Sequence, residues 1–381
     1  MVLQYTAVGL QTRRPEFHKS HVDPSARWED KASVRRQITE HLPDIIERAV
    51  RRSSYDMPVR LICLPEGQIN GYVLSEEVIK KGEVYTIPGE ETDLLGEFCK
   101  KYDSYLVASM ACVRPELIEG RSFNTAFILD PRGKIVYKHS KGSFYYPETG
   151  STAPSDIWSR LLELSNGDAK KMLDLMYPVA KTKIGNIGCL VGGESTWFEP
   201  SRAFALNGAE ILWRTSYEDP YLFNEMWEVQ NRAFAVFNSC YVIAPNTAGL
   251  DHGRSEIIDY QGRILSLINY TREGFAAAIF NIDGLRDYRV RGLYVASAIK
   301  AIRTEQYMYI YKAFEDQGGL FPRNLHMDQY ALSREQNKLL HCWLINRAVE
   351  LGIYTPPLGW KPYKIRKDLL DILEETRKKY G

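Results

Sequence analysis

The sequence of 381 residues is short of several features that would assign a function at once. Its formal net charge is only +1, so bulk electrostatics favour neither a nucleic acid nor a membrane surface as a partner. No apolar run approaches the roughly 20 residues that span a bilayer. The segment 1–11 lacks the basic and apolar regions of a signal peptide. The sequence therefore predicts a cytoplasmic protein that binds neither nucleic acid nor membrane.

Motifs for disulfides, metals and nucleotides are also missing. The six cysteines form no CxxC pair, which predicts buried, reduced thiols. The seven histidines show no metal-ligand spacing, and the chain contains neither a GxGxxG motif nor a P-loop. We therefore expect no metal and no cofactor.

Hydrophobic periodicity predicts strands interleaved with long helices. Apolar residues at helical spacing indicate an amphipathic helix over 31–52, and the continuous apolar run 59–64 indicates a buried strand that ends near Glu66. Further strands are expected at 5–10, 105–111, 124–129, 134–139, 187–191, 240–245 and 275–282 and near 209, with helices at 90–102, 154–176, 221–238 and from 199. Two mixed sheets covered by helices would bury such strands, so we predict a four-layer α-β-β-α sandwich.

The pattern changes after residue 292. Helices are expected at 295–314, 333–352 and 366–379, joined by links that contain Gly and Pro. We divide the chain into one α/β domain, 1–292, and a helical C-terminal extension, 293–381. The extension either adds a layer or packs on another subunit. We favour a subunit-contact arm, because a core complete by about residue 290 leaves the extension no internal role.

Chemically reactive side chains follow three of the expected strands, at 64–67, 138–141 and 187–199. Sites of α/β proteins lie at such strand ends. The third place is a sharp turn between a strand and a helix. A nucleophile belongs there, because the tight backbone exposes its side chain and nearby amides face a developing oxyanion. Position 192 in this turn holds a glycine, which has no side chain to attack with.

The order of these three places along the chain resembles that in the nitrilase superfamily of carbon–nitrogen hydrolases. The resemblance covers roughly residues 5–292, and members of this superfamily use a Glu-Lys-Cys triad. The other matching pieces are Asn124-Thr125-Ala126, Glu199, Arg202, Gly208 to Leu212 and Asn231-Arg232-Ala233. The resemblance implies that Glu66 is the general base and that Lys141 stabilises the tetrahedral intermediate. The family often places its lysine two residues after a strand tyrosine, which here is His139, so Lys138 remains a rival.

The resemblance also fixes the nucleophile position. In the family the cysteine precedes the glutamate of an E-x-x-R motif by seven residues, and counting back from Glu199 gives Gly192. Glu194 then takes the place of a family acid, and Gly193 offers a backbone N–H to an oxyanion. A shift to Cys189 would break the spacing to Glu199, so Cys189 is a weak candidate.

Family members often carry a second glutamate after the lysine that orients the substrate, and Glu148 is our candidate. The neighbouring Tyr145, together with Trp197 and Tyr217, either lines a pocket or only packs. His139 is interpreted as strand filler.

The resemblance implies hydrolysis of an amide or N-carbamoyl group to a carboxylic acid with release of ammonia or an amine. Nitrilases tend to have Trp after the nucleophile, so Gly193 favours an amide over a nitrile substrate. Gly192 has three interpretations: an inactivated thiol hydrolase whose cysteine was replaced by engineering, a natural pseudoenzyme that binds a ligand or a protein, or unusual chemistry through water or Cys189. Association into a homodimer or larger homo-oligomer is also implied, because family members associate across the face that bears the helix after the turn.

Overall fold

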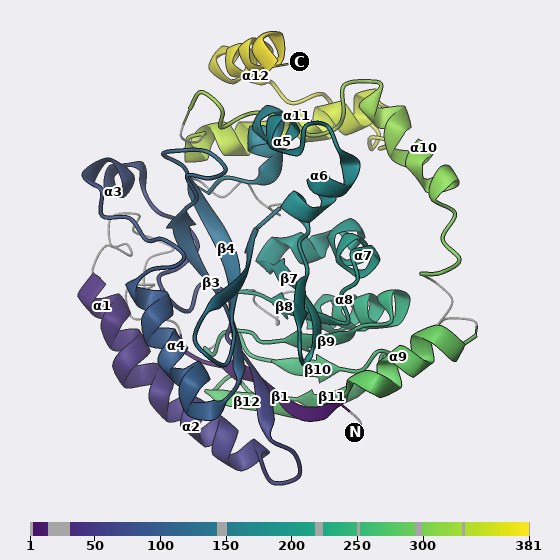
Figure 1. The fold of residues 1–381 in the computed structure, drawn as a ribbon. Coiled ribbons are helices and arrows are strands. Elements are labelled where there is room, and N and C mark those ends of the chain that lie inside the picture. Colours follow the sequence, from purple (N-terminus) through teal and green to yellow (C-terminus); the bar gives the residue numbers. More distant parts are fainter. Residues whose placement is uncertain are drawn as a thin grey trace.

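The structure, a computed structural model, describes residues 3–13, 31–142, 151–217, 224–249, 252–293, 299–329 and 332–380. Its strands form two six-stranded mixed sheets that pack face to face, and helices cover the outer face of each (Figure 1). This α-β-β-α sandwich confirms the predicted architecture. Within the described ranges, the helices are all too short or too polar to cross a membrane.

The first sheet has the strand order β12-β1-β2-β3-β4-β5. β1, β2 and β3 are parallel to one another, whereas β12, β4 and β5 pair antiparallel to their neighbours. The strand bounds are β12 Gly274–Asn281, β1 Gln4–Gln11, β2 Val59–Cys63, β3 Tyr105–Val113, β4 Ser122–Leu129 and β5 Ile135–Ser140. Its outer face is covered by α1 Lys31–Arg36, a π-helical turn Gln37–His41, α2 Leu42–Ser53 and α4 Glu90–Tyr102. The short α3 Glu76–Lys81 contributes Val78 to the same core.

The second sheet has the order β11-β10-β9-β8-β7-β6, with β7, β8 and β9 parallel. Its strands are β11 Ile264–Leu267, β10 Glu256–Ile258, β9 Tyr241–Ala244, β8 Ile211–Thr215, β7 Gly185–Val191 and β6 Ala180–Thr182. The outer face is covered by α7 Phe198–Leu206 and α8 Asn224–Asn238.

Strand alternation divides the core into layers. Along β7, Ile187, Cys189 and Val191 enter the core between the two sheets, whereas Leu190 packs under α7 and α8. Side chains of a strand alternate between the two faces of its sheet, so both faces of this central strand are apolar. All six cysteines are free, and all are buried except Cys342, which is half-buried on a tail helix. The expectation of buried thiols therefore fails only at Cys342.

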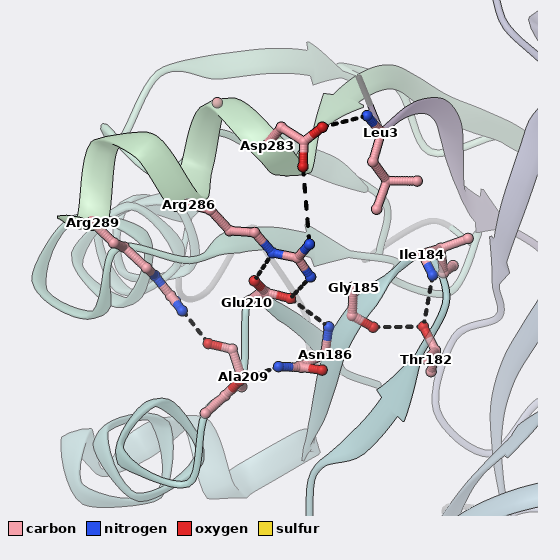
Figure 2. Close-up of polar contacts among 12 residues, drawn as sticks. Leu3, Thr182, Ile184, Gly185, Asn186, Ala209, Glu210, Asp283, Arg286 and Arg289 are labelled. Carbon is pink, nitrogen blue, oxygen red and sulfur yellow. Dashed lines mark hydrogen bonds and ion pairs between the residues drawn. The ribbon is translucent and has the colours of Figure 1, made fainter. Parts of the chain in front are cut away.

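Helix α9, Ile282–Arg291, was not predicted from the sequence, and polar contacts hold it against the second sheet (Figure 2). The Arg286 guanidinium pairs with both carboxylate oxygens of Glu210, with N···O distances of 2.7 and 3.1 Å. Arg289 donates to the backbone oxygen of Ala209, and Asp283 accepts from the backbone N–H of Leu3. The helix therefore links the residue before β1 to the start of β8, an interior strand of the other sheet.

The helical segment 154–176, which we call the insertion, and the C-terminal extension lie together at one side of the sandwich (Figure 1). The insertion forms a 3-10 turn Pro154–Ile157, α5 Trp158–Ser165 and α6 Ala169–Met176, and the extension forms α10 Thr304–Glu315, α11 Arg334–Glu350 and α12 Lys367–Tyr380. Of the helix expected over 295–314, residues 295–298 lie outside the described part of the chain, and 299–303 form irregular turns. Helix α10 itself begins at Thr304, and none of its residues is buried. The extension is anchored where the backbone N–H groups of Asn324 and His326 donate to the carbonyls of Ser155 and Asp156. Its contact with another subunit remains a prediction.

A buried carboxyl group lies between α8 and the second sheet. Glu256 on β10 is fully buried, and its Oε1 accepts from Asn231 Nδ2 at 2.6 Å. Oε2 of the same carboxyl is buried and has no hydrogen-bond partner. Burial raises the pKa of Glu256 to about 7.

This pKa predicts a pH-dependent stability. The unfolded carboxyl ionises near pH 4.5 and the folded one near pH 7, so the free energy of unfolding should fall across that interval. The loss should reach roughly 3 kcal/mol and persist at higher pH. Urea titrations from about pH 4.5 to 8 should show a decline that Glu256→Gln removes, while Glu228→Gln on the adjacent α8 keeps it. Identical pH profiles for the original chain and Glu256→Gln would contradict the prediction.

Candidate functional site

Glu66 lies at the end of β2, where the apolar strand passes into a turn through Leu64 and Pro65. Its side chain is buried, with a residual exposure of 3%. The carboxylate oxygen Oε1 accepts from Lys141 Nζ at 3.2 Å and from Asn124 Nδ2 at 2.7 Å. An ionised carboxylate can be buried when charged and hydrogen-bonding partners replace water. The structure therefore brings two of the predicted site residues together and adds Asn124.

The pairing of β4 with β5 positions these two partners. Asn124 belongs to β4, and Lys141 directly follows β5, where its backbone N–H donates to the carbonyl of Asn124 at 2.8 Å. Asn124 matched the family pattern in the sequence, but no role followed from that match. Its amide supplies the second hydrogen bond to Glu66.

The structure separates the two lysine candidates. Lys138 donates to Glu116 at 2.7 Å and to the carbonyl of Ile87, away from Glu66. Residues three apart on a strand lie on opposite faces, so only one of the two lysines can face the site. That lysine is Lys141.

The turn at Gly192 faces Glu66. β7 ends at Val191, and a 3-10 turn, Gly192–Thr196, leads into α7. Gly192 has φ of +51°, in the left-handed region that disfavours side chains, and a Cβ built on it would lie 2.6 Å from Glu66 Oε1. A side chain at position 192 would therefore point directly at the acid, and the carboxylate would have to move to admit it.

Glu194 ties the turn to the lysine strand. Its buried carboxylate accepts from the backbone N–H groups of Val191 at 2.7 Å and Gly142 at 2.6 Å. It also lies 3.1 Å from His139 Nε2. His139 was interpreted as strand filler, but it is fully buried and holds this acid. Its spacing of two residues from Lys141 was a signal, because both then lie on the inner face of the strand.

Of the other predicted residues, Gly193, Trp197 and Tyr217 belong to the described part of the chain and two do not. Gly193 follows Gly192 and is half-buried, and Trp197 is 39% exposed. The ring of Tyr217 packs on His252 with centroids 5.6 Å apart. Tyr145 and Glu148 fall outside the described residues.

Cys189 is fully buried in the core between the sheets, and burial raises the pKa of its thiol well above its usual value. A thiol in this position is neither ionised nor accessible, so the geometry argues against Cys189 as a substitute nucleophile. Among the described residues, no three His, Cys, Asp or Glu side chains cluster as metal ligands.

These features define a class, an α/β sandwich whose polar site lies at strand ends beside a strand-to-helix turn. The sequence model of the carbon–nitrogen hydrolases matches residues 24–290. The chain therefore belongs to the carbon–nitrogen hydrolase family, which confirms the resemblance to the nitrilase superfamily.

Individual relatives are distant. A formamidase from Bacillus cereus (strain Q1) is 27% identical over 244 residues, which are 62% of this chain and 65% of the formamidase. The chain thus matches about 65% of the length of such relatives.

Among solved structures, a carbon–nitrogen hydrolase from Helicobacter pylori G27 superposes with a TM-score of 0.59 at 19% identity, covering 81% of this chain and 99% of that one. A cysteine-to-alanine mutant of an amidase from Nesterenkonia AN1 gives 0.52 at 16% identity, covering 81% and 97%. At such identities the likeness shows the fold alone.

The buried pair predicts unequal effects of two lysine substitutions. Lys141→Ala leaves the Glu66 carboxylate buried without its cation, so the free energy of unfolding should fall by roughly 3 kcal/mol. Lys138→Ala removes a half-exposed pair and should cost less than about 1 kcal/mol. Urea denaturation of both variants measures the difference. Equal losses would show that the pair contributes no more than a surface contact.

Proposed function

We propose that the site formed by Glu66, Lys141 and the turn at Gly192 binds a small primary amide and, in this sequence, does not hydrolyse it. The observation that supports this most directly is the buried acid–amine pair against which a side chain at position 192 would point. The matched family and the distant formamidase and amidase relatives support an amide as the ligand.

An amide complements the pair. The Lys141 ammonium can donate to the carbonyl oxygen, and Glu66 can accept from the amide N–H. A nitrile offers a hydrogen-bond acceptor but no N–H donor, so Glu66 would receive no hydrogen bond from it. The same geometry therefore favours an amide over the alternative nitrile.

With a thiol at position 192 the same groups would carry out hydrolysis. Glu66 would take the thiol proton, and the thiolate would attack the carbonyl carbon. Lys141 and the backbone N–H of Gly193 would hold the oxyanion. Ammonia would leave with the proton from Glu66, and water would then hydrolyse the thioester to the carboxylic acid. Without a sulfur at position 192 the reaction cannot proceed beyond binding of the amide. This holds whether the chain is an inactivated hydrolase or a natural pseudoenzyme.

We also propose that the chain associates with a second copy. The face that bears α7 and α8 exposes Leu206, Val229 and Phe237, and α10 of the extension exposes Met308. Apolar side chains exposed on neighbouring helices are typical of subunit contacts.

Restoring a thiol tests the proposed chemistry. Gly192→Cys should release ammonia from formamide or propionamide at least about a hundredfold faster than the original chain. That gain is far below the roughly six decades that a nucleophile contributes in proteases, because the new Cβ displaces the Glu66 carboxylate. Gly193→Cys is the matched control and should stay inactive. The double change Gly192→Cys with Glu66→Gln should also lack activity.

Two outcomes would contradict this function. No ammonia from Gly192→Cys across amides and nitriles would exclude a latent hydrolase, and turnover of nitriles alone would exclude the amide preference. Calorimetric titration of the original chain with propionamide tests binding directly. Glu66→Gln should weaken that binding, and unchanged affinity would place the amide elsewhere.

A further inference from the structure

A cavity of about 690 Å³ lies between the helical insertion and the C-terminal extension. The 3-10 turn 154–157, the start of α5 and the end of α6 form one wall, and α11 with the segment before it forms the other. Tyr311 of α10 and the start of α7 complete the lining. The volume falls in the range of roughly 300–1,000 Å³ that small-molecule sites occupy. Glu66, Lys141 and Gly192 do not line it.

One wall carries a buried carboxylate. Asp156 is 4% exposed, and its Oδ2 accepts from the backbone N–H of Ala153 at 2.9 Å. His326, which is 7% exposed, brings Nδ1 to 3.5 Å from the same oxygen and to 3.2 Å from Thr152 Oγ1. Ser151 also lines the cavity, and its hydroxyl is buried and has no hydrogen-bond partner. Polar groups therefore converge on a cavity that is otherwise mostly apolar.

The rest of the lining is rich in aromatic rings and acidic at its rim. The lining includes Trp158, Tyr177, Trp197 and Tyr311. Glu199 lies exposed at the rim, where its carboxylate accepts from the Tyr311 hydroxyl at 2.5 Å. The described lining residues include two carboxylates and neither lysine nor arginine. Aromatic rings beside carboxylates are the surroundings that organic cations prefer.

We propose that this cavity binds a hydrophobic organic amine in its ammonium form, with the ammonium group against Asp156 and the apolar part among the aromatic and aliphatic side chains. Glu199 attracts the cation at the entrance. The inference does not depend on amide binding at Glu66.

The charge of the lining decides between ligand classes. A carboxylate ligand would meet Asp156 and Glu199 as like charges. A neutral ligand would leave the buried carboxyl without a counter-charge beyond His326. Burial raises the pKa of Asp156, while His326 opposes that rise, so the ionised carboxylate is poorly solvated and gains from a bound cation.

Calorimetric titration with 2-phenylethylamine at neutral pH tests the site, and 2-phenylethanol serves as its uncharged counterpart. The amine should bind at least tenfold more tightly than the alcohol. Asp156→Asn should abolish that preference, and Glu199→Gln, at an exposed position with little risk to folding, should weaken amine binding about threefold. Leu344→Trp, which fills part of the cavity, should weaken both ligands.

Two controls separate this site from other effects. Asp328→Asn changes an exposed acid of the same extension that does not line the cavity, and amine binding should be unchanged. Glu66→Gln should also leave it unchanged, so failure of the amide proposal and failure of this one are distinguishable. Equal binding of amine and alcohol, no binding of the amine, or a charge preference that survives both Asp156→Asn and Glu199→Gln would each overturn the proposal.

Discussion

The ion pair between Glu66 and Lys141 is the constraint on which the site depends. Both side chains are almost fully removed from water, so each charge is tolerable only beside the other. Buried ion pairs contribute little net stability compared with apolar residues of similar size, but losing one partner is costly. The pair therefore fixes the geometry of the strand ends more than it stabilises the fold. Asn124 and the backbone of Gly192 are arranged around it.

The fold meets this constraint by bringing three strand ends to one place. Glu66 follows β2, Lys141 follows β5, and the turn at Gly192 follows β7. β5 and β7 belong to different sheets. Glu194 bridges the sheets, because it accepts hydrogen bonds from Val191 at the end of β7 and from Gly142 after β5. A change in the packing between the two sheets would thus alter the geometry of the ion pair between Glu66 and Lys141.

Periodicity predicted most of the sandwich. The order of motifs led us to expect Glu66 beside Gly192, and the two residues do lie next to each other. Motif spacing alone left open whether Lys141 or Lys138 faces Glu66. The two lysines lie on opposite faces of the strand, so the register of β5 was needed to choose between them. His139 was missed because its partner, Glu194, is distant in sequence. Helix α9 was missed, and its contact with Glu210 joins residues that are distant in the sequence. These failures share a cause, since long-range partners are invisible to local patterns.

The left-handed backbone at residue 192 has a consequence for how this chain relates to thiol-bearing relatives. Any residue other than glycine there holds a strained conformation that costs on the order of 1–3 kcal/mol, and it also crowds the acid. Glycine relieves both. The glycine therefore lets the backbone turn between β7 and α7 without conformational strain and leaves the Glu66 carboxylate in contact with Lys141 and Asn124.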